Sequence, residues 1–433
     1  MRISIVFFIL FSINIFSQES IYFFKDSLQQ YNIENIDEAK FSLVKKSVLE
    51  KYSKSSYWFK VPAKKTLDKY IFRITYDRVF NANAYQHNLK IAQVPNHRYL
   101  AYSFNRDADF YLQVTPKVHS YIPVELEKEK NLLEKENKIY LFNGFYYGFA
   151  FLIILYNLLY FFVFRDKSFL YYALFLTSVC FGIFVMDGML NLFNVNEKLN
   201  DILMILNYIS LAYFSSKFAD SYLQLNRYYP KLKRNSYIIG FFIVVLGFLY
   251  ILNPNYYYML WINILVFTLQ FVYWITSILL FKKNLYVKLL TFAYAILIIS
   301  AIDFFILKFL GISVIDINAT TIKIGAFVEM SILSFAVLFR MNALKRENKQ
   351  IKKDLVVYSK QFAAAKDHIN TKELLGSLSL REREIFNLIT KTNKEIAAEL
   401  NISVNTVKFH VKNIYEKLNI KSRKEVITIK ESQ

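Results

Sequence analysis

The sequence is poor in the residues from which most catalytic and metal sites are built. Its 433 residues include one cysteine and five histidines, and no two histidines have the H-x-x-x-H or H-E-x-x-H spacing of a zinc site. Cys180 falls inside a long apolar run, so the chain before that run has no disulfide and no thiolate metal site. P-loop, G-x-G-x-x-G and G-x-S-x-G motifs are also missing. We therefore expect no catalytic residues, no metal and no cofactor.

Long apolar runs, by contrast, are abundant. Hydrophobic residues make up 55% of the chain and aromatic residues 18%, which is too apolar for a single soluble domain. A helix needs about 20 residues to cross the hydrocarbon core of a membrane, and only a helix satisfies its backbone groups within one segment. The runs predict a seven-helix transmembrane bundle over residues 140–341. The predicted spans are 140–164, 168–190, 199–223, 236–252, 257–281, 286–310 and 315–341.

Basic residues lie in alternate loops of this bundle. The loops on the other side hold a single lysine, Lys198, beside Glu197. Short loops rich in Lys and Arg stay in the cytoplasm, so the chain is predicted to enter the bundle from outside and to leave it inside. These loops explain part of the net charge of +20, and the tail beyond Leu344 keeps a basic excess of its own. The basic residues that follow the first, third, fifth and seventh spans are Arg165, Lys167, Arg227, Lys231, Lys233, Arg234, Lys282, Lys283, Lys345 and Arg346.

The chain before the bundle is predicted to be exported. Residues 1–17 place Arg2 before a short apolar run and are typical of a cleaved signal peptide. An uncleaved eighth helix would also leave residues 18–139 outside. Alternation over residues 70–76 and 110–114 predicts a small β-sandwich, and residues 125–138 a helix or stalk that leads into the first span. Three aromatic residues could stack on a flat ligand, although core packing is favoured: Tyr57, Trp58 and Tyr85.

Among the ionisable residues of the predicted spans, three are candidates for a role within the membrane. Asp303 and Lys323 are expected at similar depths below the outer surface, where they could pair. Glu329 lies nearer the middle of the seventh span without an obvious basic partner, so we expect it to be protonated or hydrogen-bonded between helices. Static adhesion between helices is favoured for all three residues over a signalling relay.

Several short motifs in the spans resemble a known receptor family. Tyr146–Gly148, Leu155–Asn157, Arg165–Asp166 and Tyr171–Tyr172 resemble the opening of the bacterial seven-transmembrane receptors with diverse intracellular signalling modules, and Gly325–Arg340 resembles their last span. The resemblance implies a bacterial cytoplasmic (inner) membrane location. It also implies that the exported domain is a jelly-roll-like sandwich that binds a small molecule, often supposed to be a carbohydrate. The ligand and its binding residues remain unknown.

A heptad pattern follows the seventh span. Its charged residues fall off the apolar seam, which favours a two-stranded parallel coiled coil over a helix lying along the membrane. The single polar seam position, Asn348, is typical of coiled coils that fix register and dimeric state. We therefore predict a coiled-coil linker over residues 342–370. The seam positions are Met341, Leu344, Asn348, Ile351, Leu355, Tyr358, Phe362 and Ala365.

Three helix starts follow the linker. Ser379 with Glu382, and Thr392 with Glu395, have capping-box spacing, and Ser403 is placed to cap a third helix. These positions divide the tail into short helices separated by tight turns, which is typical of a small helical domain.

The sequence of these helices resembles the LuxR-type helix-turn-helix domain. The matching blocks are Leu378–Ile385, Asn393–Leu400 and Ile402–Leu418, closed by Ser422–Arg423, and they predict such a domain over residues 371–433. The family usually has a Gly-containing pair of extra residues before the second block. This chain lacks that pair, so we expect a tighter turn between the first two helices.

The resemblance assigns DNA contacts to the third helix, which enters the major groove. Lys408, Phe409 and Lys412 are expected to read base edges, since Lys suits guanine and Phe suits a thymine methyl group. The other face of the helix is expected to pack, together with residues before it: Leu400, Ile402, Val407, Val411, Ile414 and Leu418. Residues expected to contact phosphate are Asn393, Lys394, Thr406, His410 and Asn413.

These features predict a multi-domain membrane protein that senses a signal outside and regulates transcription inside. Its expected partners are DNA, the lipid bilayer and an unknown extracytoplasmic ligand, with a homodimer formed through residues 341–365 and the DNA-binding domain. A kinase or cyclase is rejected because the tail has neither the room nor a phosphate loop. A tail that recruits another regulator, or one released by proteolysis, stays open as an alternative.

Overall fold

A computed structural model describes residues 20–431 except 45, 119–120 and 315–317, and the side chains of 362–374 and 428–431 are not described. The predicted signal peptide lies outside the described residues. The chain divides into two compact units, Met1–Arg340 and Met341–Gln433.

Unit one begins with a β-sandwich of two antiparallel sheets, as predicted. Rings from the two sheets meet between them: the Phe59 and Phe72 centroids lie 5.9 Å apart, and those of Phe104 and Phe110 lie 4.0 Å apart. The six-stranded sheet has the order β2 (Ser42–Val44), β1 (Ile21–Asp26), β4 (Ser56–Val61), β9 (Phe110–Val114), β6 (Ala82–Gln86) and β7 (Leu89–Ile91). The four-stranded sheet has the order β3 (Ser47–Leu49), β10 (Tyr121–Lys128), β5 (Lys69–Ile74) and β8 (Leu100–Asn105).

Strand β5 is buried on both faces. One face packs in the sandwich core, and the other meets the first turns of helix α2 (Glu129–Phe164), where Ile71 and Ala101 pack with Leu132. The predicted stalk therefore starts later than expected, because residues 125–128 still belong to β10. The core role favoured for Tyr57 and Trp58 is confirmed, since their side chains are buried.

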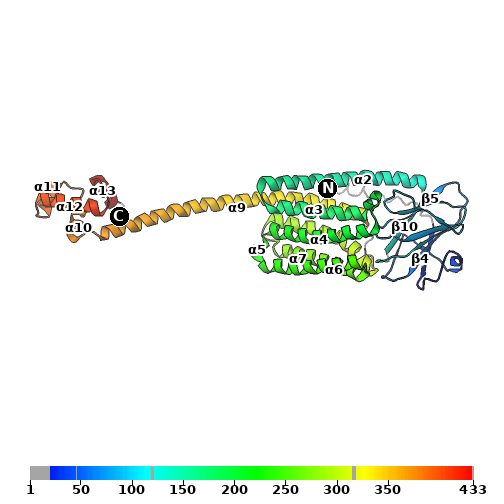
Figure 1. The fold of residues 1–433 in the computed structure, drawn as a ribbon. Coiled ribbons are helices and arrows are strands. Elements are labelled where there is room, and N and C mark those ends of the chain that lie inside the picture. The colour runs from blue at the N-terminus through cyan, green and yellow to red at the C-terminus, as the bar shows by residue number, and fades with distance from the viewer. Residues whose placement is uncertain (1–19, 45, 119–120, 315–317, 432–433) are drawn as a thin grey trace. The chain divides into compact units, whose positions relative to one another are not determined.

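The rest of unit one is a helical bundle. Among the described residues, seven helices are long and apolar enough to cross a membrane, as predicted for residues 140–341. Neighbouring helices such as α3 and α4 run side by side (Figure 1). Polar side chains cap three helix starts: Asp166 for α3, Asn196 for α4 and Asn255 for α7. The helices after α2 are α3 (Lys167–Met186), α4 (Glu197–Leu223), α6 (Pro230–Leu252), α7 (Tyr256–Leu279), α8 (Leu285–Ile302) and α9 (Ala319–Gly376).

Short helical turns complete the bundle. A 3₁₀ turn, η2 (Met189–Phe193), replaces the end of the predicted second span, and α5 (Leu225–Tyr228) precedes α6. Helix α8 continues into a π-helical turn, η3 (Asp303–Leu307), and a 3₁₀ turn, η4 (Lys308–Leu310). A further 3₁₀ turn, η1 (Ile36–Glu38), lies in the β-domain.

Helix α9 is the seventh bundle helix and continues through the predicted linker. Beyond the bundle, its apolar seam residues are exposed in the single chain, with Ile351 at 48%, Leu355 at 62% and Tyr358 at 68%. The last two seam positions, Phe362 and Ala365, lie outside the residues whose side chains are described. The coiled coil stays a prediction, because the seam is helical and apolar but has no partner chain here.

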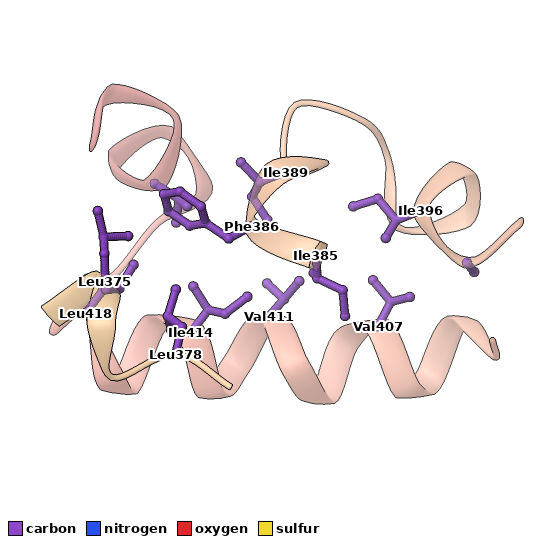
Figure 2. Packing of buried hydrophobic residues seen from close by; sticks show 12 residues of the cluster. Leu375, Leu378, Ile385, Phe386, Ile389, Ile396, Val407, Val411, Ile414 and Leu418 are labelled. Carbon is purple, nitrogen blue, oxygen red and sulfur yellow. The ribbon is translucent and has the colours of Figure 1, made fainter. Parts of the chain in front are cut away.

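Unit two ends in four short helices: α10 (Leu380–Asn387), α11 (Asn393–Glu399), α12 (Val404–Lys417) and α13 (Arg423–Glu431). Figure 2 shows Val407, Val411 and Ile414 projecting from α12 toward Ile385 and its neighbours, where they form one hydrophobic core. Both predicted capping boxes are present, and Ser403 accepts a hydrogen bond from the Thr406 amide at 3.0 Å. The predicted packed face of α12 is confirmed, with Leu400 and Ile402 at its edge.

Candidate nucleic-acid interface and polar network of the bundle

Helix α12 has a buried face and an exposed basic face, because apolar residues recur every three or four positions along it. Lys408, Phe409 and Lys412 all lie on the exposed face, and the Phe409 side chain is 60% exposed. Most of this ring faces solvent, and its centroid lies 5.5 Å from that of the neighbouring His410 ring. Lys412 lies 3.8 Å from Glu416, but both side chains are exposed, so this ion pair holds the lysine only weakly.

The predicted phosphate contacts fall at the edges of this face. Lys394 is exposed on α11, whereas Thr406, His410 and Asn413 are half-buried on α12. The Thr406 hydroxyl shares a 2.7 Å hydrogen bond with Ser403, which fixes it beside the helix start. His410 Nδ1 is buried and has no hydrogen-bond partner among the described residues. The structure thus brings these residues together around one end and one side of α12.

Asn393 has a structural role that the sequence reading missed. Its Oδ1 accepts a hydrogen bond of 2.7 Å from Arg423, which also donates to the carbonyls of Ile389 (2.8 Å) and Lys391. Arg423 therefore ties α13 to the turn between α10 and α11. This turn lacks the Gly-containing pair of residues that the family usually has. The Ser422–Arg423 motif at the end of the domain was the sequence feature that pointed to this contact.

An ion pair joins the start of α10 to the end of α12. Lys417 Nζ lies 2.6 Å from the Glu382 carboxylate, which also accepts from the Ser379 amide. The hydrogen bond from Lys417 lowers the pKa of Glu382 to about 2. Because the pKa is depressed, this stabilisation is present above the ordinary glutamate pKa and is lost only as pH falls toward 2. At neutral pH the recognition helix is held firmly against its neighbours.

The predicted pairing of Asp303 with Lys323 is wrong. Lys323 lies 3.0 Å from Asp187 and donates a 2.5 Å hydrogen bond to Asn143, and all three side chains are buried. Asp303 instead accepts a 3.1 Å hydrogen bond from the Val314 amide. Similar depth did not predict contact, because Asp187, at the end of α3, is the carboxylate that faces Lys323.

Glu329 is fully buried in α9. As predicted, it has no basic partner in the part of the chain that the structure describes, and neither carboxylate oxygen accepts a hydrogen bond there. A charged carboxylate without a partner is expensive in a membrane. The expectation of a protonated side chain therefore remains the simplest interpretation.

At the end of the bundle next to the β-domain, a buried charge cluster joins the β-domain to the helices. Arg98 donates two 2.9 Å hydrogen bonds to Glu136 of α2, and Arg73 of β5 donates one of 2.6 Å to the same carboxylate. Arg98 also donates to the Asp187 carbonyl at 3.0 Å. Since Asp187 pairs with Lys323, one continuous polar network runs from β5 to α9.

Close backbone contact completes this junction. Gly188 has a φ of 68°, and a Cβ atom there would collide with the Arg98 carbonyl, so glycine alone permits the approach. Asn191 donates a 2.6 Å hydrogen bond to that same carbonyl. A cleft of about 600 Å³ lies against the network and includes Arg73, Arg98 and Lys323 in its lining.

At the opposite end of the bundle, Arg340 fastens α9. Its guanidinium donates to the carbonyls of Tyr222 (2.7 Å) and Ser221 (2.8 Å), and it pairs with Asp166 at 2.7 Å. Helix α9 is thus held near its two ends within the bundle by charged side chains. The contacts of Lys323 and Arg340 therefore depend on the positions of α2, α3 and α4.

Comparison with known proteins identifies families for the helical bundle and for the C-terminal helices. Residues 139–340 match the family described as 7TM diverse intracellular signalling, and residues 376–429 match bacterial regulatory proteins of the luxR family. The spore germination protein GerE of Bacillus subtilis is 48% identical over 52 residues, covering 12% of this chain and 70% of GerE.

The match to longer relatives covers a small part of each chain. The HTH-type transcriptional regulator MalT of Vibrio campbellii is 40% identical over 70 residues, which are 15% of this chain and 8% of MalT. The probable transcriptional regulatory protein SgaR of Hyphomicrobium methylovorum is 44% identical over 57 residues, which are 13% of this chain and 27% of SgaR. The chain therefore belongs to the luxR family of bacterial regulatory proteins through its DNA-binding domain, which it carries behind a 7TM diverse intracellular signalling domain.

Proposed function

We propose that this protein is a one-component transcription regulator of the bacterial cytoplasmic membrane, without enzymatic activity. The observation that carries the proposal is the span of helix α9. Its Lys323 and Arg340 belong to the bundle contacts, and its Leu375 packs in the core of the helix-turn-helix domain. A single helix therefore takes part in both the receptor and the DNA-binding domain.

The signal is proposed to enter from the β-domain. The polar network joins that domain to α9, and the adjoining cleft has a volume within the range of small-molecule sites. A small polar ligand, a carbohydrate among them, that bound in the cleft would contact Arg73, Arg98 or Lys323 directly. Differential binding to two arrangements of this network would bias the position of α9.

The proposal is tested by selecting DNA fragments from the organism's genome with the full-length protein in detergent. We expect recovery of specific sites, and transcripts of the neighbouring genes should change in a deletion strain. Recovery of no specific DNA, together with retention of another regulator, would favour the recruiting tail. A soluble C-terminal fragment on immunoblots after stimulation would favour proteolytic release.

Base reading is expected to depend on the exposed face of α12. Substituting Lys408 or Lys412 by alanine should each cost about 1–3 kcal/mol of binding to the selected site, with relaxed specificity at one base pair. The control is Lys394→Ala, which removes an exposed lysine of α11 that is expected to contact phosphate. This variant should weaken all sequences alike and lower the salt slope by about one. Identical behaviour of the three variants on all sequences would contradict the base assignment.

The proposed orientation predicts the location of reporter fusions. Fusions after Lys283 and after Gln433 should report a cytoplasmic position, and fusions after Glu197 or Asn255 an external one, because the basic loops are retained inside. Paired alkaline phosphatase and fluorescent protein reporters at each site make the measurement. A cytoplasmic signal at Glu197 would contradict the orientation.

A further inference from the structure

A groove with one polar end and one apolar end lies between α4 and α6. Its walls extend over residues 209–220 of α4 and 233–244 of α6, α7 contributes Leu269 and Tyr273, and its volume is about 260 Å³. At about 1.5 Å per helical residue, each wall is about 16 Å long. That length is close to half of the roughly 30 Å hydrocarbon core, which is one leaflet of a bilayer.

The polar end of the groove is basic. Lys217 donates a 2.7 Å hydrogen bond to the Tyr237 hydroxyl, and its ammonium lies 5.4 Å from the centroid of the Tyr213 ring. Lys233 faces it from α6, and neither lysine has an ion-pair partner among the described residues. Asp220 is the one acidic residue in the lining, so the lining holds two ammonium groups against one carboxylate.

The other end of the groove is apolar and open. Ile209, Ile243 and Val244 line it, and Val244 is 47% exposed on a helix that is apolar enough to cross a membrane. Gly240 lies between the two ends, and a Cβ atom built there would meet no atom within 4 Å. The groove is therefore unfilled at its middle, beside side chains that would contact lipid.

We propose that this groove binds one phospholipid of the cytoplasmic leaflet that carries an anionic headgroup. Its phosphate lies at Lys217 and Lys233, and one acyl chain follows Gly240 toward Val244. Basic pockets between spanning helices on the cytoplasmic side bind anionic headgroups. Assignment to that leaflet rests on the proposed orientation, because the polar end adjoins the basic loop between α4 and α6. A soluble anion would use only the polar end, whereas the apolar length matches a chain.

Lipid titration of the full-length protein in detergent tests the proposal. Fluorescent phosphatidylglycerol should bind about 25-fold more tightly than phosphatidylcholine of the same chain length, since each of the two lysines near an anionic headgroup contributes about a fivefold preference. Combined Lys217→Gln and Lys233→Gln should lower phosphatidylglycerol affinity about 25-fold, to that of phosphatidylcholine, whose headgroup has no net charge and whose binding should change far less. That retained binding shows that the lysine variant is folded.

A second variant tests the apolar half. Gly240→Leu should weaken both lipids, because its side chain occupies the space of the acyl chain. The matched control is Gly148→Leu on α2, where a Cβ atom would also meet no atom within 4 Å and which does not line the groove. Undiminished binding by Gly240→Leu would overturn the proposal, as would a lysine variant that keeps the preference.

Two further measurements distinguish the lipid site from a soluble anion site, and failure of this site from failure of the proposed function. Competition by free glycerol 3-phosphate at the concentrations used for the lipid would also overturn the proposal, because it would show a soluble anion site. Retention on DNA at low salt depends on unit two and should be unchanged in all three variants. Loss of lipid binding while DNA binding is intact would therefore reject the lipid site and would leave the proposed function uncontradicted.

Discussion

Glu136→Gln is expected to destabilise unit one by about 3–5 kcal/mol and to abolish the response to the external signal. The Glu136 carboxylate is buried between the guanidinium groups of Arg73 and Arg98, and it accepts hydrogen bonds from both. Without that charge, Arg98 loses its carboxylate partner, and Arg73 keeps its ion pair with Glu125. Removal of one partner from a buried ion cluster leaves uncompensated charge, which is the costly case.

Two properties of the Glu136→Gln variant are measured: its unfolding midpoint and transcription from the target promoter. A lower unfolding midpoint of the full-length protein should accompany constant transcription from the target promoter, because Glu136 no longer fixes the Arg98 side chain that donates to the Asp187 carbonyl. Glu134→Gln is the matched control, since Glu134 is exposed on the same helix and its substitution should stay within about 0.5 kcal/mol. Normal regulation in Glu136→Gln would show that the signal bypasses this network.

Inserting two residues after Lys349 is expected to lock regulated transcription on or off, whereas inserting seven should preserve it. Helix α9 contains this position, and each helical residue turns by about 100°. Two extra residues therefore rotate the upstream seam by about 200° relative to the downstream seam. Seven residues restore the heptad frame with only a small residual rotation. Transcription from a reporter with and without the signal makes the comparison.

Both insertions lengthen the linker, but only the two-residue insertion changes the rotational phase of the seam. Comparison of the two therefore separates the effect of phase from the effect of length. The proposed mechanism needs two α9 helices paired along the exposed seam of Ile351, Leu355 and Tyr358. If both insertions regulate normally, the linker is only a tether and rotation of α9 carries no signal. Cross-linking of a cysteine placed at Leu355 measures the pairing itself, and the native Cys180 belongs to α3 and not to the seam.

The sequence by itself determined the elements of this protein, because each depends on local patterns. Apolar runs of spanning length set the seven helices, and capping residues such as Ser379, Thr392 and Ser403 set the starts of the C-terminal helices. The exposed face of α12 followed from the resemblance to the LuxR-type domain, and the spacing of its apolar residues agrees with it. These features need no knowledge of distant residues.

The tertiary structure decided the partners of the buried charges. Asp187 rather than Asp303 pairs with Lys323, Glu136 joins Arg73 to Arg98, and Arg423 clasps the turn before α11. Depth in a span or place in a motif could not select these partners, because they come from segments far apart in the chain. A buried charge takes the opposite group that packing brings within hydrogen-bond distance, and packing is a property of the whole fold.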